Sequence, residues 1–250
     1  MARHIEDEVK YYYDSHPTQE DLMGETSFHA DLVNYLLDVL RWLFHGRLYA
    51  IYDNLNFYQT SEYKEYPIAP DIAIIKGIAH RPTRSWRVSE HRPAPQVVFE
   101  IASEETWKKD LLEKPGKYAA MGVQEYFAYD PNEPLLSRSA NRRLFGWQLD
   151  ASGHSMKAMP SRSDGALWSP SLESWLVPDG TILQLYDHDG LMRLTHAEFA
   201  DQQADLAIQQ ADLATRQTDL AIQQAEAEAR RSRVYAEKLR SLGIDPDQLL

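Results

Sequence analysis

Two carboxylates beside apolar strands are the residues of this sequence best placed to do chemistry. Glu100 interrupts the otherwise apolar run 96–103, and Asp71 immediately precedes the apolar run 72–75. Both faces of the 96–103 strand are apolar apart from Glu100, so we expect a central strand buried on both sides. A carboxylate there is costly unless it is paired, hydrogen-bonded or bound to a metal.

Neighbouring strands that carry Asp71 and Glu100 would offer an oxygen-rich site for a hard cation such as Mg²⁺, with Mn²⁺ as a substitute. Such a metal orients a phosphodiester and helps to generate a hydroxide nucleophile. A nearby lysine would stabilise the charge that develops on the phosphate. The candidate lysines after the Glu100 strand are Lys108, Lys109, Lys114 and Lys117.

Five motifs follow one another along the chain: Pro70-Asp71, the apolar strand with Glu100, the run 110–114 followed by Tyr118, the run 122–126, and Tyr129-Asp-Pro131. In this order they resemble the Uma-two (Uma2) family. That family is a bacterial group assigned to the restriction endonucleases of the PD-(D/E)XK nuclease superfamily. The resemblance covers residues 18–195, and the tail after residue 195 is outside it.

The resemblance implies an α/β (α+β) fold with a restriction-endonuclease-like core, in which helices flank a mixed central sheet. It also implies a Mg²⁺-dependent endonuclease that acts on DNA, with Asp71 and Glu100 as catalytic metal ligands. The superfamily pattern has a lysine two residues after the glutamate, where this chain has Ala102. The family shares this departure, and a lysine of the following helix takes the role. Lys114 is therefore the expected third catalytic residue.

Each site residue also has a simpler interpretation. Asp71 alone is consistent with a turn residue at a strand entry, Glu100 with a buried glutamate paired with an arginine, and Lys114 with a solvated helix residue. Pro115 leaves two alternatives open, because a proline inside a helix removes a hydrogen bond. Either the helix begins near Glu113 or it bends there. The shared order of the motifs favours the site.

Apolar periodicity predicts the elements that position these residues. A helix is expected over 28–45, capped by Ser27 and ended by Gly46. Glu25 and His29 lie at its start, where we favour a surface or capping role over catalysis. The other expected elements are strands at 48–52, 55–59, 124–129, 143–149 and 154–160, a cover segment at 168–176, and a last hairpin of 182–186 with 191–194.

We expect three parts in the chain: a peripheral N-terminal segment over 1–17, a nuclease-like domain over 18–195, and a helical tail over 196–250. A capping box at 195–198 opens the tail helix, and a seven-residue repeat begins at Asp205. Apolar residues then recur at alternating three- and four-residue steps, which predicts a coiled-coil seam. The seam consists of Ile208, Ala211, Thr215, Thr218, Ile222 and Ala225.

A neighbouring stripe of Leu206, Leu213 and Leu220 is expected to flank the seam. The seam is weak, because alanine and threonine bury little area. A free, partly solvated helix is the alternative. We favour self-association into a homo-oligomer through this helix.

Composition limits the class of protein. A chain of 250 residues that is 43% hydrophobic supports one domain with a packed core and an appendage, and no apolar run is long enough to span a bilayer. The absence of cysteine and of an apolar leader favours a cytoplasmic protein. The net charge of −12 disfavours binding of nucleic acid through bulk electrostatics, so a nuclease would need a local basic surface.

The segment 80–92 is a candidate for that surface, because it has four arginines against the single acid Glu90, with Trp86 available for stacking. The alternative is a solvated loop whose arginines pair with the protein's own acids. The four arginines are Arg81, Arg84, Arg87 and Arg92.

The first hypothesis is a metal-dependent DNA endonuclease that hydrolyses phosphodiesters with a Mg²⁺-activated water. The second is a catalytically silent nuclease-like protein that binds DNA or acts as a scaffold through its coiled coil. Ala102, Pro115 and the acidic net charge favour the silent protein, whereas the pair Asp71 and Glu100 favours the enzyme. Nuclease activity on RNA or branched DNA is a third alternative.

Overall fold

The computed structural model of the protein describes residues 27–59, 67–89, 92–138, 140–243 and 245. The peripheral segment expected over 1–17, and Glu25, lie outside the described residues. The chain divides into two compact units, one that ends at His196 and one that begins at Ala197. The expected domain boundaries at 17/18 and 195/196 stay a prediction, namely that the parts they separate fold independently.

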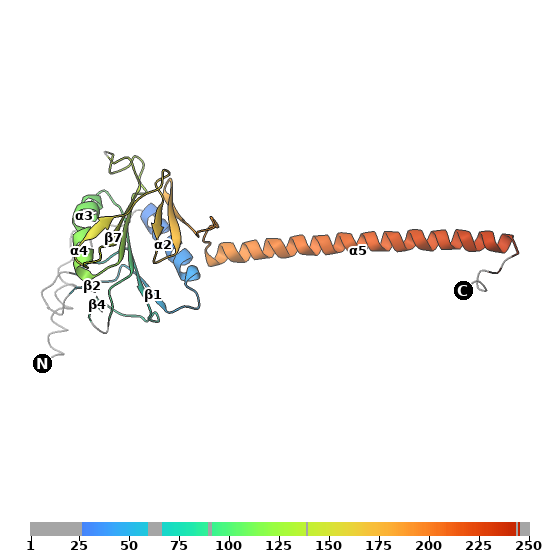
Figure 1. Cartoon of the computed structure of the whole chain (residues 1–250), viewed down its shortest axis with the longest axis horizontal. Coiled ribbons are helices and arrows are strands. Elements are labelled where there is room, and N and C mark those ends of the chain that lie inside the picture. The colour runs from blue at the N-terminus through green and yellow to red at the C-terminus, as the bar shows by residue number, and fades with distance from the viewer. Residues whose placement is uncertain (1–26, 60–66, 90–91, 139, 244, 246–250) are drawn as a thin grey trace. The chain divides into compact units, whose positions relative to one another are not determined.

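A mixed six-stranded sheet forms the centre of the first unit (Figure 1). Strands β5 and β6 pair in parallel, and the other neighbours pair antiparallel. This arrangement confirms the expected mixed α/β fold. In spatial order the strands are β1 (Tyr49–Asp53), β3 (Ile72–Lys76), β5 (Val97–Ile101), β6 (Glu125–Tyr129), β7 (Leu144–Leu149) and β8 (Met156–Ala158).

Strand β5 lies between β3 and β6, and all five of its residues are buried. The antiparallel register of β3 and β5 pairs Ile72 with Phe99. Continued by one residue, the same register sets Asp71 opposite Glu100. The strand pairing therefore brings together two carboxylates that are 29 positions apart in the sequence.

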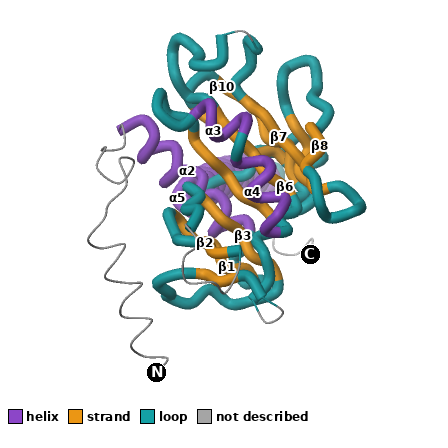
Figure 2. The backbone as a smooth tube through the Cα atoms, turned by 90° about the vertical axis from the view of Figure 1, so that its left-hand side faces the viewer, coloured by secondary structure: helices purple, strands orange, loops and turns teal. Residues whose placement is uncertain are grey.

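Helices cover both faces of this sheet. The helix α2 (Ser27–Leu43) packs its leucines on the face that holds Phe99 and Ile101. The helices α3 (Trp107–Leu112) and α4 (Lys114–Met121) lie together on the opposite face (Figures 1 and 2). Glu100 belongs to the α3/α4 side, where Val98, Tyr118 and Tyr126 are buried.

The run 107–121 resolves the question raised by Pro115. It forms two helices separated by Glu113, with Pro115 in the first turn of α4. A proline is tolerated there because the first N–H groups of a helix have no intrahelical acceptor. Lys114 is thus the first residue of α4 rather than part of a bent helix.

Two small sheets complete the unit. The antiparallel sheet β9 (Leu167–Ser169), β10 (Ser174–Asp179) and β11 (Ile182–Tyr186) packs its leucines into the core on the α2 side. The expected hairpin of 182–186 with 191–194 forms over a short stretch: Tyr186 and Met192 make an antiparallel bridge, and the N–H of Arg193 donates to the carbonyl of Leu185. The other edge of β11 pairs with β10, where the buried Leu185 sits across from the buried Leu176.

The second unit contains the single helix α5 (His196–Ser241), which runs without interruption (Figure 1). None of its residues is buried; among its large apolar residues, Leu239 is of intermediate exposure and the exposed ones range from Phe199 at 38% to Tyr235 at 67%. The expected helix is present, and the coiled coil stays a prediction. No helix in the described part of the chain is both long and apolar enough to cross a membrane.

Candidate active site

Asp71 is fixed at the mouth of β3 by two contacts. Its Oδ2 atom accepts a hydrogen bond from the backbone N–H of Ile101 at 2.6 Å. Its Oδ1 atom lies 3.2 Å from His29 Nε2 at the start of α2. The side chains of His29 and Asp71 are 12% and 18% exposed, so the pair reaches solvent at the edge of the fold. Asp71 is therefore more than a turn residue.

Glu100 projects from β5 into the buried layer beneath α3 and α4. Its side chain is 4% exposed, and its Oε1 atom accepts a short hydrogen bond from the hydroxyl of Tyr118. The same oxygen lies 2.8 Å from the ammonium of Lys114. The counter-ion of Glu100 is thus a lysine, not the arginine of the simpler interpretation.

Lys114 bridges Glu100 to a third carboxylate, Asp110. The distance from Lys114 Nζ to Asp110 Oδ1 is 2.8 Å, and the two residues are four positions apart, on one side of the α3–α4 segment. Asp110 is 1% exposed, and its Oδ2 atom accepts a hydrogen bond from Thr106 Oγ1 at 2.9 Å. The backbone carbonyl of Asp110 accepts a further hydrogen bond from Tyr126.

Burial and charge act together on the protonation of this cluster. Burial raises the pKa of Glu100 from 4.5 to about 8, with Asp71 and Asp110 adding to the rise and Lys114 opposing it. Burial likewise raises the pKa of Asp110. Burial alone would lower the pKa of Lys114, but Glu100 and Asp110 raise it above 10.5. Lys114 therefore stays charged, while the carboxyl groups carry the cost of desolvation.

Without metal, the raised pKa of Glu100 should make the free energy of unfolding fall as pH rises. Between pH 4.5 and about 8 the folded state keeps a proton that the unfolded state releases, so the stability present at low pH is lost across this range. Thermal and urea unfolding in chelator should show a shallower decline for Glu100→Gln. The exposed Glu104→Gln is the control, with the wild-type slope expected. Equal slopes for wild type and Glu100→Gln would contradict the burial cost assigned to Glu100.

The donor set fits a hard divalent cation. The carboxyl groups of Asp71, Glu100 and Asp110 share the cluster with one ammonium, which contacts Glu100 and Asp110, so the fully ionised cluster has an excess of two negative charges. Asp110 Oδ1 is buried without a well-directed hydrogen bond, although the ammonium of Lys114 is close. Within the described ranges, no three His, Cys, Asp or Glu side chains form an ion site by themselves. Mg²⁺ suits such a site, because it usually takes one or two carboxylates and completes its shell with phosphate oxygens and waters.

The other candidate lysines are directed elsewhere. Lys108, Lys109 and Lys117 are exposed, and the ammonium of Lys108 lies 5.5 Å from the centre of the Trp107 ring. Ala102, at the superfamily's usual lysine position, lines a small cavity with Trp107, Leu111 and Asp130 among its walls. The lysine that contacts Glu100 comes from α4 instead.

Sequence reasoning missed three contributors to the cluster. His29 contacts Asp71, although a surface or capping role was favoured for it. Asp110 and Tyr118 entered only as parts of a motif, yet both bind members of the cluster. The spacing of 110, 114 and 118 was the available signal, because residues four apart share one side of a helical segment.

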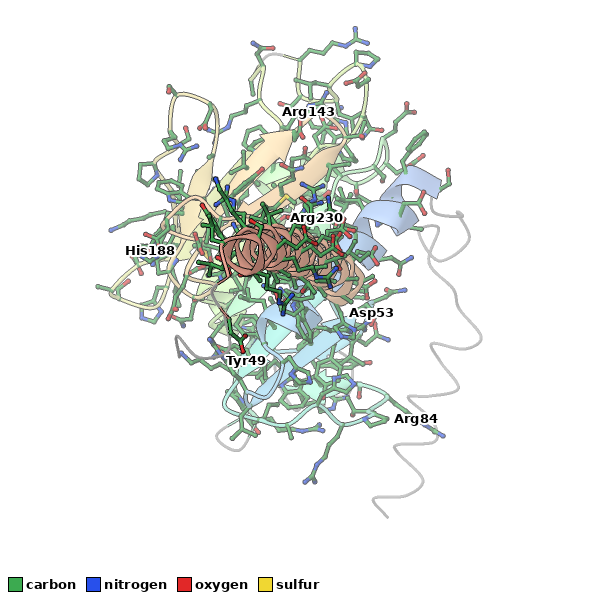
Figure 3. The ribbon with its side chains drawn as sticks, turned by 90° about the vertical axis from the view of Figure 1, so that its right-hand side faces the viewer. Tyr49, Asp53, Arg84, Arg143, His188 and Arg230 are labelled. Carbon is green, nitrogen blue, oxygen red and sulfur yellow. The ribbon has the colours of Figure 1, made fainter. Side chains whose placement is uncertain are left out.

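The arginine segment differs from its expected form. Trp86 is buried at 6% exposure, donates its ring N–H to the carbonyl of Pro93, and is covered by Arg92 at 4.5 Å, so the prediction that it stacks on bases is wrong. Arg87 packs on the ring of Tyr58 in the same way. Arg84 is exposed and points away from the fold (Figure 3). Glu90 lies outside the described residues.

The arginine segment follows β3 in the sequence but folds back beside residues near the start of that strand. Trp86 pairs with Phe57, and Phe57 forms an antiparallel bridge with Ile68, three residues before Asp71. The hydroxyl of Tyr52, which lies opposite Ala73, donates to the carbonyl of Arg81. At the end of the sheet that carries Asp71, Arg143 donates hydrogen bonds to the carbonyls of Asp130 and Asn132 in the loop after β6.

Comparisons with known proteins agree with the sequence motifs. Residues 2–173 match the family Uma2, which is described as "Putative restriction endonuclease". The crystal structure of "a putative nuclease belonging to DUF820" from Anabaena variabilis is similar at a TM-score of 0.40, with 15% sequence identity, over 60% of this chain and 76% of that chain. A search among curated proteins found no match.

Proposed function

Because the chain belongs to the Uma2 family, described as "Putative restriction endonuclease", we propose that it is a metal-dependent endonuclease that hydrolyses phosphodiester bonds in DNA. The observation that carries this proposal is the cluster of Asp71, Glu100 and Lys114. Strand register and a 2.8 Å ion pair link a residue just before β3, a residue of the central strand β5 and the first residue of α4. Carboxylates beside a lysine that stays charged are the groups that phosphodiester hydrolysis requires.

We assign to Lys114 the role of stabilising the negative charge that develops on the phosphate. The Lys114 side chain is 17% exposed, so the ammonium lies in a largely desolvated setting. An ammonium in such a setting stabilises a developing anion more strongly than one in water, because the local dielectric is low. Its contribution therefore belongs to turnover more than to substrate affinity.

The remaining residues hold this arrangement in place. His29 and the N–H of Ile101 orient Asp71, and the hydroxyl of Tyr118 orients Glu100. Asp110 also contacts the ammonium of Lys114 and gives it a second counter-charge. That second partner allows Glu100 to turn an oxygen toward another cation without leaving Lys114 unpaired.

Mg²⁺ or Mn²⁺ would be held by Asp71 and Glu100. When bound, such a cation neutralises phosphate charge and lowers the pKa of water. Two further proposals follow from the sequence: the protein acts in the cytoplasm, and it self-associates through α5.

Titration calorimetry with Mn²⁺ tests the metal part of this proposal. Wild-type protein should bind with a Kd between micromolar and millimolar, as expected for a two-carboxylate site. The double variant Asp71→Ala, Glu100→Ala should lose that heat, whereas Glu104→Ala should keep it. Equal heats from the wild type and the double variant would show that the ion binds elsewhere. EDTA-sensitive nicking of supercoiled plasmid by the wild type is the matching test of the chemistry.

A further inference from the structure

We propose that α5 pairs with α5 of a second copy of this chain in antiparallel orientation, along the seam of Ile208, Ala211, Thr215, Thr218, Ile222 and Ala225. This inference rests on the self-association proposed above and adds its orientation and its face. Two independent features of α5 support it: the distribution of apolar residues around the helix and the distribution of charge along it.

The first feature is that the two apolar stripes of α5 are on opposite sides. At 100° per residue, Leu206 is about 170° from the midline between Ile208 and Ala211. The expectation that the leucines flank the seam is therefore wrong. Alanines at every seventh position border the seam instead and continue it as a flat apolar surface. These alanines are Ala200, Ala207, Ala214 and Ala221.

The leucine stripe offers a poorer contact, because it has one large residue in each seven and glutamines on both sides. The seam has a residue at every three- or four-residue step, which is the spacing that packs helices side by side. Both stripes are open to solvent, with Ile208 at 61% and Leu213 at 57% exposure. Continuity therefore favours the seam as the contact face.

The second feature is that the charge of α5 changes sign along its length. Residues 197–229 contain seven acids and one arginine, whereas residues 230–241 contain five basic residues and one acid. A parallel pair would place the basic end beside the basic end of the second copy. An antiparallel pair places it beside Glu198, Asp201 and Asp205, and does so at both ends.

The helix dipoles act in the same direction. Antiparallel neighbours bring the positive amino end of one helix beside the negative carboxyl end of the other. The helix has 46 residues and is about 69 Å long, so the two ends of a pair make separate contacts. The charge pattern and the dipoles therefore favour one orientation at both ends of the pair.

Disulfide trapping tests the orientation cleanly, because the chain has no cysteine of its own. When the seams of two antiparallel copies meet, each residue of the series 208, 215 and 222 faces one of the series 211, 218 and 225. Thr215 of one copy then meets Thr218 of the other, and Ala204 meets Ala229. The full-length variants Ala204→Cys, Thr215→Cys, Thr218→Cys and Ala229→Cys are incubated singly and in mixtures in a glutathione redox buffer, with one partner carrying a larger tag.

The expected result is a disulfide in the mixture of Thr215→Cys with Thr218→Cys and in the mixture of Ala204→Cys with Ala229→Cys, with little in Ala204→Cys alone. Trapping of Ala204→Cys with Ile222→Cys would also support antiparallel pairing, shifted by one heptad. Efficient trapping of Ala204→Cys with itself would overturn the orientation. A monomeric mass by light scattering at tens of micromolar, with no trapping in any mixture, would overturn self-association. None of these readouts depends on cleavage.

A matched pair of variants tests the face. Ile208→Gln with Ile222→Gln should weaken the dimer at least tenfold in Kd, whereas Leu206→Gln with Leu220→Gln should leave it within about twofold. The reverse order would assign the contact to the leucine stripe and overturn the seam. Raising NaCl from 50 to 500 mM should also weaken an antiparallel dimer, because exposed opposite charges are screened. A dimer that salt strengthens would indicate like charges in contact and a parallel pair.

Discussion

Replacing Lys114 should lower Mg²⁺-dependent cleavage about a hundredfold or more while DNA and metal binding stay close to wild type. The ammonium acts on charge that develops in the transition state, so its loss lowers turnover more than affinity. Lys114→Met is the variant of choice, since it keeps the aliphatic bulk of a side chain that is 17% exposed. Single-turnover cleavage rates and DNA binding in Ca²⁺ would separate the two effects.

Lys117→Ala is the matched control, because Lys117 is an exposed lysine on the same helix. Its cleavage rate should stay within a few fold of wild type. Removing Lys114 leaves Glu100 and Asp110 without their shared cation, and an unpaired buried charge is destabilising. Thermal unfolding must therefore show that Lys114→Met is folded at the assay temperature. A folded Lys114→Met that cleaves at the wild-type rate would remove Lys114 from the mechanism.

Asp110→Asn should lower the cleavage rate at least tenfold although Asp110 is not expected to contact the substrate. It removes the second counter-charge of Lys114, which leaves the ammonium paired with Glu100 alone. A double-mutant cycle decides whether Asp110 acts through Lys114. In the Lys114→Met background, Asp110→Asn should cause no further loss of rate.

Metal affinity provides a second measurement for the same residue. Asp110→Asn should weaken Mn²⁺ binding in the wild-type background, because Lys114 then competes with the metal for Glu100. It should leave Mn²⁺ binding unchanged once Lys114 is methionine. Thr106→Val, which removes the hydrogen bond to Asp110 Oδ2, should give a smaller loss of rate. An additional tenfold loss in the Lys114→Met background would mean that Asp110 contacts the metal or substrate directly.

Most strands of the sheet were predictable from the sequence, because local sequence patterns define them. The strands β3, β5 and β6 are short apolar runs with clear boundaries, so their positions follow from periodicity and breakers. The pairing of Asp71 with Glu100 followed from the order of motifs in a resembling family. The register between β3 and β5, which sets Asp71 opposite Glu100, could not be predicted from the sequence, because antiparallel pairing depends on partners far apart in the chain.

The unpredicted features all depend on contacts between distant segments. Trp86 was expected to be open to bases, but it is buried under Arg92 in the short strand β4 (Trp86–Arg87), which pairs with the distant β2 (Phe57–Tyr58). His29 is 42 residues from Asp71, and no spacing rule connects a helix start to a strand entry. Asp110 is the exception, since its four-residue distance from Lys114 was visible in the sequence. The leucine stripe of α5 lies opposite the seam because two positions along a helix correspond to a rotation of about 200°.

Cleavage of DNA by the purified wild-type protein is the most direct test of the central claim, that Asp71, Glu100 and Lys114 form a metal-dependent phosphodiesterase site. Wild-type protein and the isosteric variant Glu100→Gln are each incubated with supercoiled plasmid, linear duplex, single-stranded and branched DNA. The Mg²⁺ or Mn²⁺ concentration is about 5 to 10 mM, which matches the millimolar affinities expected for such sites. The account predicts EDTA-sensitive cleavage of at least one substrate by the wild type, and about a hundredfold less by Glu100→Gln. A folded wild-type protein that binds DNA and cuts none of these substrates would contradict the enzyme and favour a catalytically silent, DNA-binding scaffold.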